Sequence, residues 1–165
     1  MPTEPLWLAH ARTKIGVTEI KGSHHNPTII GWANLLGAKI LGVAVKDDET
    51  PWCGLFVAMC MHVVGIVPPK IAIRAKSWAA WGTDVKPCAG AVLVFGRDGG
   101  GHVGFYVKED AEAYYVLGGN QSNSVNTTRI AKSRLIACRW PAGHAITTVP
   151  VIVATKSKTL SRNEA

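Results

Sequence analysis

The sequence lacks the features of a membrane-spanning, secreted or repetitive protein. Its longest unbroken apolar stretch, residues 55–61, is far shorter than the about 20 residues that a membrane-spanning helix needs. No basic stretch followed by a continuous apolar one opens the chain, so we expect no signal peptide and synthesis in the cytoplasm. Repeats and persistent heptads are also missing, which excludes collagen-like and coiled-coil architectures.

Negative charge is scarce. The 165 residues include 18 Lys and Arg but only 11 Asp and Glu, for a net charge of +7 and a pI near 9.4. This excess favours an anionic partner such as nucleic acid, a membrane surface or a bacterial wall. The basic residues are scattered and form no nucleic-acid recognition motif, so we expect no nucleic-acid partner. A chain of this length is sufficient for one hydrophobic core. We also expect the protein to be a monomer.

Paired cysteine motifs are absent too. The chain has four cysteines, Cys53, Cys60, Cys88 and Cys138, none in a C-x-x-C arrangement. A disulfide framework or a thiolate zinc site is therefore not expected, and most of these cysteines should be buried. His24, His25 and His62 lack the spacing of a metal motif, and the acidic run 47–49 is typical of a solvated turn. We expect neither a metal nor another cofactor.

The hydrophobic period changes near Gly90, from helical to strand-like. It predicts helices over residues 5–14, 26–37, 51–64 and 73–81. Strands are predicted over residues 91–95, 102–107, 113–117, 125–130 and 135–140. This order is typical of an α+β domain in which N-terminal helices pack on an antiparallel meander. We expect that domain to span residues 1–141, followed by a basic, flexible tail over residues 142–165.

Cys53 differs from the other cysteines in its position. Thr50 is a good N-cap and Pro51 a good first helical residue, which places Cys53 near the third position of an apolar helix. Unpaired backbone N–H groups and the helix dipole favour a thiolate there. The position suits a catalytic nucleophile, although an inert buried cysteine is compatible with it.

His102 follows three glycines at the start of a predicted strand. It shares a strand face with Gly104, which leaves space for another element to approach. An imidazole there is able to take the proton of Cys53, although a structural histidine fits the pattern as well.

Asn120 lies in a Gly-Gly-Asn-Gln stretch that ends the strand expected to pair with the histidine strand. Its amide oxygen can accept a hydrogen bond from the far nitrogen of His102 and hold the reactive tautomer. Simple turn chemistry is the alternative explanation of this stretch.

These motifs, in this order, resemble the papain-like peptidoglycan hydrolases of the CHAP and NlpC type, and their small phage endolysin-like branch in particular. The resemblance covers residues 6–140. The matching segments are residues 15–22 and 49–57, Trp78, residues 81–82, 101–106 and 117–123. It implies a papain-like fold in which Cys53 is the nucleophile, His102 the general base and then acid, and Asn120 the orienting residue. We expect Trp52, Trp78 and Gln121 to contact the substrate.

The resemblance also implies cysteine-dependent cleavage of an amide bond in bacterial peptidoglycan. Amidase and endopeptidase activity need the same catalytic groups, so the bond cleaved stays open. Such an enzyme would act at the cell wall after phage release or export. The alternative is a non-catalytic module on the same fold that binds the cell wall or nucleic acid.

Overall fold

Helices form the N-terminal half of the chain and strands the C-terminal half, as the change in hydrophobic period predicted. The computed structural model describes residues 4–19, 26–42, 51–97, 100–154, 159–161 and 164. The helices are α1 (Leu6–Arg12), α2 (Pro27–Leu41), α3 (Cys53–Val63) and the 3-10 helices η1 (Ala75–Ala80) and η2 (Lys132–Arg134). The strands are β1 (Thr83–Asp84), β2 (Val92–Arg97), β3 (Gly100–Glu109), β4 (Ala113–Gln121), β5 (Ser124–Ala131) and β6 (Leu135–Trp140). The expected α+β class is confirmed.

The start of α2 follows from its sequence. The side chain of Asn26 accepts a hydrogen bond from the Thr28 backbone N–H, and Pro27 occupies the first helical position. The predicted end at Gly37 marks a kink instead, where φ is 78°, and helical structure resumes to Leu41. Glycine adopts this left-handed conformation without the steric cost of a Cβ atom.

The six strands form one antiparallel sheet in the order β1-β6-β2-β3-β4-β5. Strands β2 to β5 are the expected meander. Strand β6 departs from it, because it returns to pair with β2, with Leu93 opposite Cys138. The two-residue strand β1 was not predicted, since a segment so short has no hydrophobic period.

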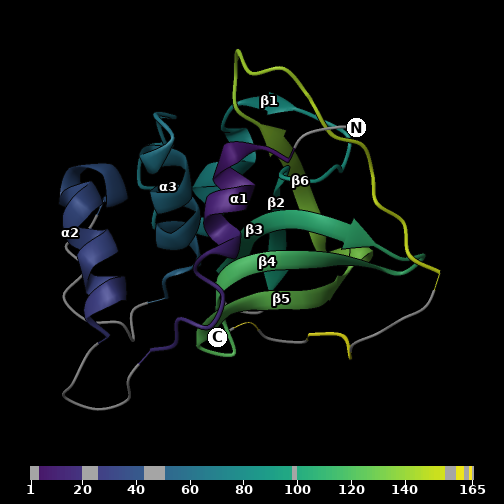
Figure 1. Ribbon diagram of the computed structural model, residues 1–165, viewed down its shortest axis with the longest axis horizontal. Helices are drawn as coiled ribbons and strands as arrows, with labels where there is room; N and C mark the ends of the chain where they lie inside the picture. Colours follow the sequence, from purple (N-terminus) through teal and green to yellow (C-terminus); the bar gives the residue numbers. More distant parts are fainter. Residues whose placement is uncertain are drawn as a thin grey trace.

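The three α-helices lie together on one side of the sheet (Figure 1). Helix α3 is the central one and packs against β3 and β4, with every residue from Cys53 to Met61 buried. It therefore carries its first turn on a rigid base. None of the helices in the described ranges is long and apolar enough to cross a membrane.

The chain beyond Trp140 returns to the sheet at two places. Ile152 forms a parallel bridge with Glu109 at the end of β3, and Leu160 forms one with Arg129 in β5. The C-terminal end lies beside the ends of β4 and β5 (Figure 1). The expected domain boundary at residue 141 stays a prediction.

Candidate active site

Cys53 is the first residue of α3. Trp52 takes the N-cap position, and its carbonyl accepts from the Phe56 N–H at 3.0 Å. Pro51 precedes the helix, so the prediction that it is the first helical residue and Cys53 near the third is wrong; Thr50 lies outside the described residues. The backbone N–H of Cys53 has no partner within the helix, because the first four N–H groups of a helix lack one.

A glycine allows the start of α3 to lie deep in the protein. A Cβ atom on Gly54 would lie 2.3 Å from the carbonyl oxygen of Ala72, so a residue with a side chain would clash there. The Cys53 side chain is consequently buried, and Cys53 is 3% exposed.

His102 lies on β3 opposite Phe95 and is fully buried. Its Nε2 atom lies 2.9 Å from Oε1 of Gln121. The Gln121 amide nitrogen donates to the carbonyl oxygens of Val116 at 3.0 Å and Asn126 at 2.7 Å, which fixes Oε1 as the atom that faces the imidazole. His102 Nε2 therefore carries the proton, and Nδ1 holds a free lone pair. Nδ1 is buried and has no hydrogen-bond partner among the residues that the structure describes.

We had expected Asn120 to bond to the imidazole. The residue that does so in the structure is Gln121. The register between β4 and β5 shifts between Gly118 and Gln121, and Asn120 has a left-handed φ of 57°. An irregularity of this kind breaks the alternation of side chains along a strand. It brings Gln121 to the face that Gly118 shares with His102, where regular alternation would have placed residue 120.

Two glycines make room for this arrangement. A Cβ atom on Gly118 would lie 2.7 Å from Gln121 Oε1 and 3.5 Å from His102 Nε2. A Cβ atom on Gly119 would lie 2.6 Å from the Trp52 ring. The Gly-Gly pair therefore lets β4 approach both the imidazole and the residue that precedes Cys53.

The thiol and the imidazole share one environment. The Val103 backbone N–H, directly after His102 in the chain, faces the sulfur of Cys53 and lowers the pKa of its thiol. The charge of Arg97 acts on both groups and lowers the pKa of each. Cys53 and His102 are therefore brought together at the junction of α3 with β3.

Burial decides the charge state of both groups. Burial raises the pKa of Cys53, and the N–H groups of Val103 and Gly54 together with Arg97 oppose that effect only in part. Burial also lowers the pKa of His102 to about 4, although the hydrogen bond to Gln121 and the charge of Glu164 act in the opposite direction. The resting pair at neutral pH is a thiol beside a neutral imidazole. The thiolate that we expected from the helix dipole is not the resting form.

The two tryptophans expected at the substrate lie in the core. Trp52 and Trp78 are fully buried. Trp52 Nε1 donates to Glu19 at 2.9 Å and Trp78 Nε1 to the carbonyl of Ala72 at 3.0 Å. Both rings pack in the core, and neither is exposed to a ligand in this structure.

Two charged residues that the sequence did not single out also lie near the imidazole. Arg134 forms a bidentate ion pair with Glu164, and the charges of both act on His102. The only sequence signal was that Glu164 is an isolated acid in a basic tail. Its meaning depends on a tertiary contact that no local pattern encodes.

Within the described ranges, no three His, Cys, Asp or Glu side chains gather closely enough to hold a metal ion. His24, His25 and the acidic run 47–49 lie outside those ranges, and His62 is in the last turn of α3. All four cysteines are free and buried.

Comparison with known proteins gave one finding. The family model of the CHAP domain matches residues 45–120, slightly less than half of the chain. This range contains Cys53 and His102 and ends at Asn120. No curated protein and no solved structure matched the chain. Residues 45–120 are thus similar to the CHAP domain, whose family consists in general of peptidoglycan hydrolases, and the order of the cysteine, histidine and asparagine motifs had indicated the same family.

Proposed function

We propose that this protein is a cysteine-dependent hydrolase that cleaves an amide bond of bacterial peptidoglycan with a Cys53–His102–Gln121 site. The observation that carries the proposal is the state of His102. Its Nε2 donates to Gln121, and its Nδ1 lone pair is unpartnered among the described residues, beside the thiol-bearing turn of α3. An imidazole held in this tautomer is equipped to act as a base toward a thiol.

The first step is formation of the nucleophile. The proton of Cys53 passes to Nδ1 of His102, and the sulfur attacks the carbonyl carbon of the substrate amide. The Val103 N–H stabilises the developing thiolate. The N–H of Cys53 itself, which donates to no carbonyl within α3, is placed to stabilise the oxyanion of the tetrahedral intermediate.

The second step releases the amine. His102 returns its proton from Nδ1 to the leaving nitrogen as the carbon–nitrogen bond breaks, which leaves a thioester on Cys53. A water molecule, deprotonated by His102, then hydrolyses the thioester to a carboxylate and restores the thiol. Gln121 keeps the Nε2 proton in place throughout and acts as a positioning residue, the part that we had assigned to Asn120.

The basic chain suits an anionic polymer. The net charge of +7 favours approach to the cell wall, an effect that added salt weakens. We further propose that the protein reaches the wall by phage release or by export, in the manner of an endolysin.

Fragments released from purified cell-wall sacculi test this function. Mass spectrometry of the fragments should show new amine and carboxylate ends, and their masses distinguish amidase from endopeptidase cleavage. Cys53→Ala should abolish fragment release while leaving the circular dichroism spectrum and sacculus binding unchanged. Cys60→Ala is the matched control, because Cys60 lies in the same helix away from the imidazole and should leave release intact. Unchanged turnover in Cys53→Ala would reject the mechanism.

A further inference from the structure

The proposed catalytic pair is closed off from solvent in this structure. Cys53 is 3% exposed and His102 is not exposed at all. A wall polymer cannot reach a sulfur atom in this state. Some part of the protein must therefore move before the reaction begins.

Glu164 lies against this closed site. Its side chain is fully buried, and its carboxylate receives hydrogen bonds from the two terminal nitrogens of Arg134, at 2.6 and 3.0 Å. Ser161 Oγ donates to the same carboxylate at 2.7 Å. The backbone carbonyl of Glu164 accepts from the N–H of Ser122, the residue that follows Gln121. The charges of Glu164 and His102 also act on each other.

Leu160 and Ser161 bind the sheet as an extended peptide does. Leu160 forms a parallel bridge with Arg129, and the Ser161 N–H donates to the Arg129 carbonyl at 2.7 Å. Strand β5 is the edge strand of the sheet, so its outer backbone groups are available for this pairing. Addition of a peptide to a free strand edge is a common mode of peptide recognition.

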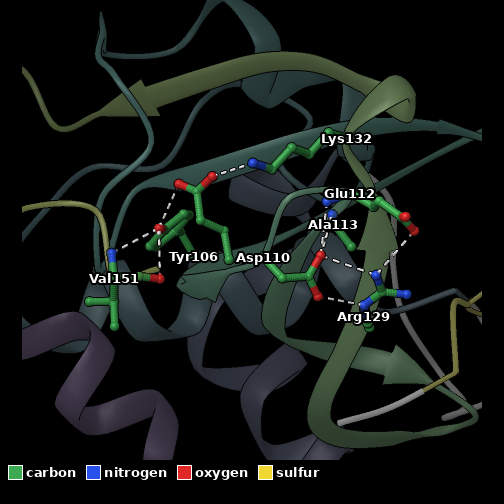
Figure 2. Close-up of polar contacts among 8 residues, drawn as sticks. Tyr106, Asp110, Glu112, Ala113, Arg129, Lys132 and Val151 are labelled. Carbon is green, nitrogen blue, oxygen red and sulfur yellow. Dashed lines mark hydrogen bonds and ion pairs between the residues drawn. The ribbon is translucent and has the colours of Figure 1, made fainter. Parts of the chain in front are cut away.

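Ion pairs and hydrogen bonds hold the strands that receive this segment (Figure 2). Arg129 pairs with the buried Asp110 at 2.8 Å, and Asp110 also accepts from the backbone N–H of Ala113 at 3.0 Å. In a second cluster of contacts, the Val151 N–H donates to the Tyr106 hydroxyl at 3.0 Å. The chain after β6 is thus attached upstream at Val151, and its later residues lie on an edge strand held by a buried ion pair.

We propose that the C-terminal segment (residues 159–161 and Glu164) blocks access to the catalytic pair as an internal substrate mimic, and that Arg134 is the group that binds a carboxylate of the substrate peptide once the segment leaves. The second half of this statement rests on the proposed function, because it assigns a wall peptide as the occupant. The substrate class is an extended peptide with a free carboxylate.

Arg134 is suited to that role by its geometry. Its Nε donates to the Gly96 carbonyl at 3.0 Å, which fixes the plane of the guanidinium. Gly96 lies opposite Gly101, the neighbour of His102, so the guanidinium is anchored close to the imidazole along the sheet. A fixed guanidinium binds a carboxylate through two parallel hydrogen bonds, as it does with Glu164 here.

Alkylation of Cys53 by iodoacetamide tests the first half of the proposal without any turnover. Glu164→Gln removes the charge that Arg134 binds, and loss of hydrogen bonds to a charged group should increase the open fraction at least about tenfold. The rate of Cys53 labelling, read by mass spectrometry, should rise by the same factor. Cys60 labelling in the same sample reports global unfolding and should not change. Glu4→Gln, which breaks the exposed pair with Arg12, is the matched control and should leave the rate unchanged.

Hydrolysis by the same variant separates blocking from assistance. If the segment blocks the site, Glu164→Gln should release wall fragments faster than the wild type. A Cys53 labelling rate equal to that of the wild type would overturn the proposal. Faster labelling together with slower hydrolysis would also overturn it, because Glu164 would then support His102 electrostatically instead of blocking the site.

Calorimetry tests the second half. A Cys53→Ala, Glu164→Gln protein should bind the synthetic tripeptide L-alanyl-γ-D-glutamyl-L-lysine with free carboxylates at least about tenfold more tightly than the fully amidated tripeptide. Adding Arg134→Gln should remove that preference. Equal affinity for the two peptides, or a preference that survives Arg134→Gln, would overturn the assignment of Arg134. These readouts need no catalysis, so they remain decisive if the proposed hydrolase activity fails its own test.

Discussion

Acid should destabilise this protein through His102 before its carboxylates titrate. The folded protein holds His102 neutral until about pH 4, whereas the unfolded chain takes up a proton near pH 6.5. Between these values the unfolded state binds more protons, so the free energy of unfolding falls as the pH falls. The linkage relation gives a loss of about 2 kcal/mol between pH 7 and pH 5.

The groups around His102 set its lowered pKa. Burial lowers its pKa most, Arg97 and Arg134 act in the same direction, and Gln121 and Glu164 act against it. None of the carboxylates needs to change its charge above pH 5 for the effect to operate. The stability contribution is therefore fully present at pH 7 and decreases through the window from 6.5 to 4.

Urea unfolding at a series of pH values, followed by circular dichroism, measures this effect. The wild type should lose about 2 kcal/mol more than His102→Gln between pH 7 and pH 5. The other titrating groups are present in both proteins, so their contributions to the free energy of unfolding cancel in the difference. Parallel pH profiles for the two proteins would refute the conclusion that His102 is buried in its neutral form.

Three further predictions concern the frame of the site. Gln121→Leu removes the acceptor of the His102 Nε2 proton and should lower kcat about a hundredfold or more, with little change in KM, in a fragment-release assay; an unchanged kcat would exclude Gln121 as the positioning residue. Gly119→Ala places a Cβ atom 2.6 Å from the Trp52 ring and should cost about 1–3 kcal/mol in urea unfolding, whereas Ala at an open glycine such as Gly100 should not. Asp110→Ala removes the buried partner of Arg129 on β5 and leaves only the exposed Glu112 at 3.6 Å, so it should cost about 3–5 kcal/mol in the same assay; a cost below about 1 kcal/mol would contradict the importance of the buried pair.

Local signals in the sequence predicted the elements that depend on local chemistry. The Asn26 cap and the change of period at Gly90 predicted α2 and the following strands to within a few residues. Cys53 and His102 were also singled out as candidates, because a cysteine at the start of an apolar helix and a histidine after glycines are local patterns; their catalytic roles stay a prediction. The pairing of β6 with β2 was not predictable in this way, since it joins segments more than 40 residues apart.

Two departures at the site depend on tertiary contacts that no local pattern encodes. The Gly-Gly-Asn-Gln stretch offered Asn120 as the partner of His102, but the register shift after Gly118 brings Gln121 there instead. Such a shift is produced by packing against neighbouring elements and leaves no periodic trace. The pair of Arg134 with Glu164 was missed for the same reason, because 30 residues separate its members.

Trapping the covalent intermediate tests the central claim most directly. The Glu164→Gln protein would be mixed with soluble peptidoglycan fragments, quenched with acid within one turnover, digested and analysed by mass spectrometry. The account predicts an acyl group bound as a thioester on Cys53, with one amine released per adduct, and no adduct on Cys60. Release of the amine with Cys53 unmodified at every quench time would contradict the assignment of Cys53 as the nucleophile.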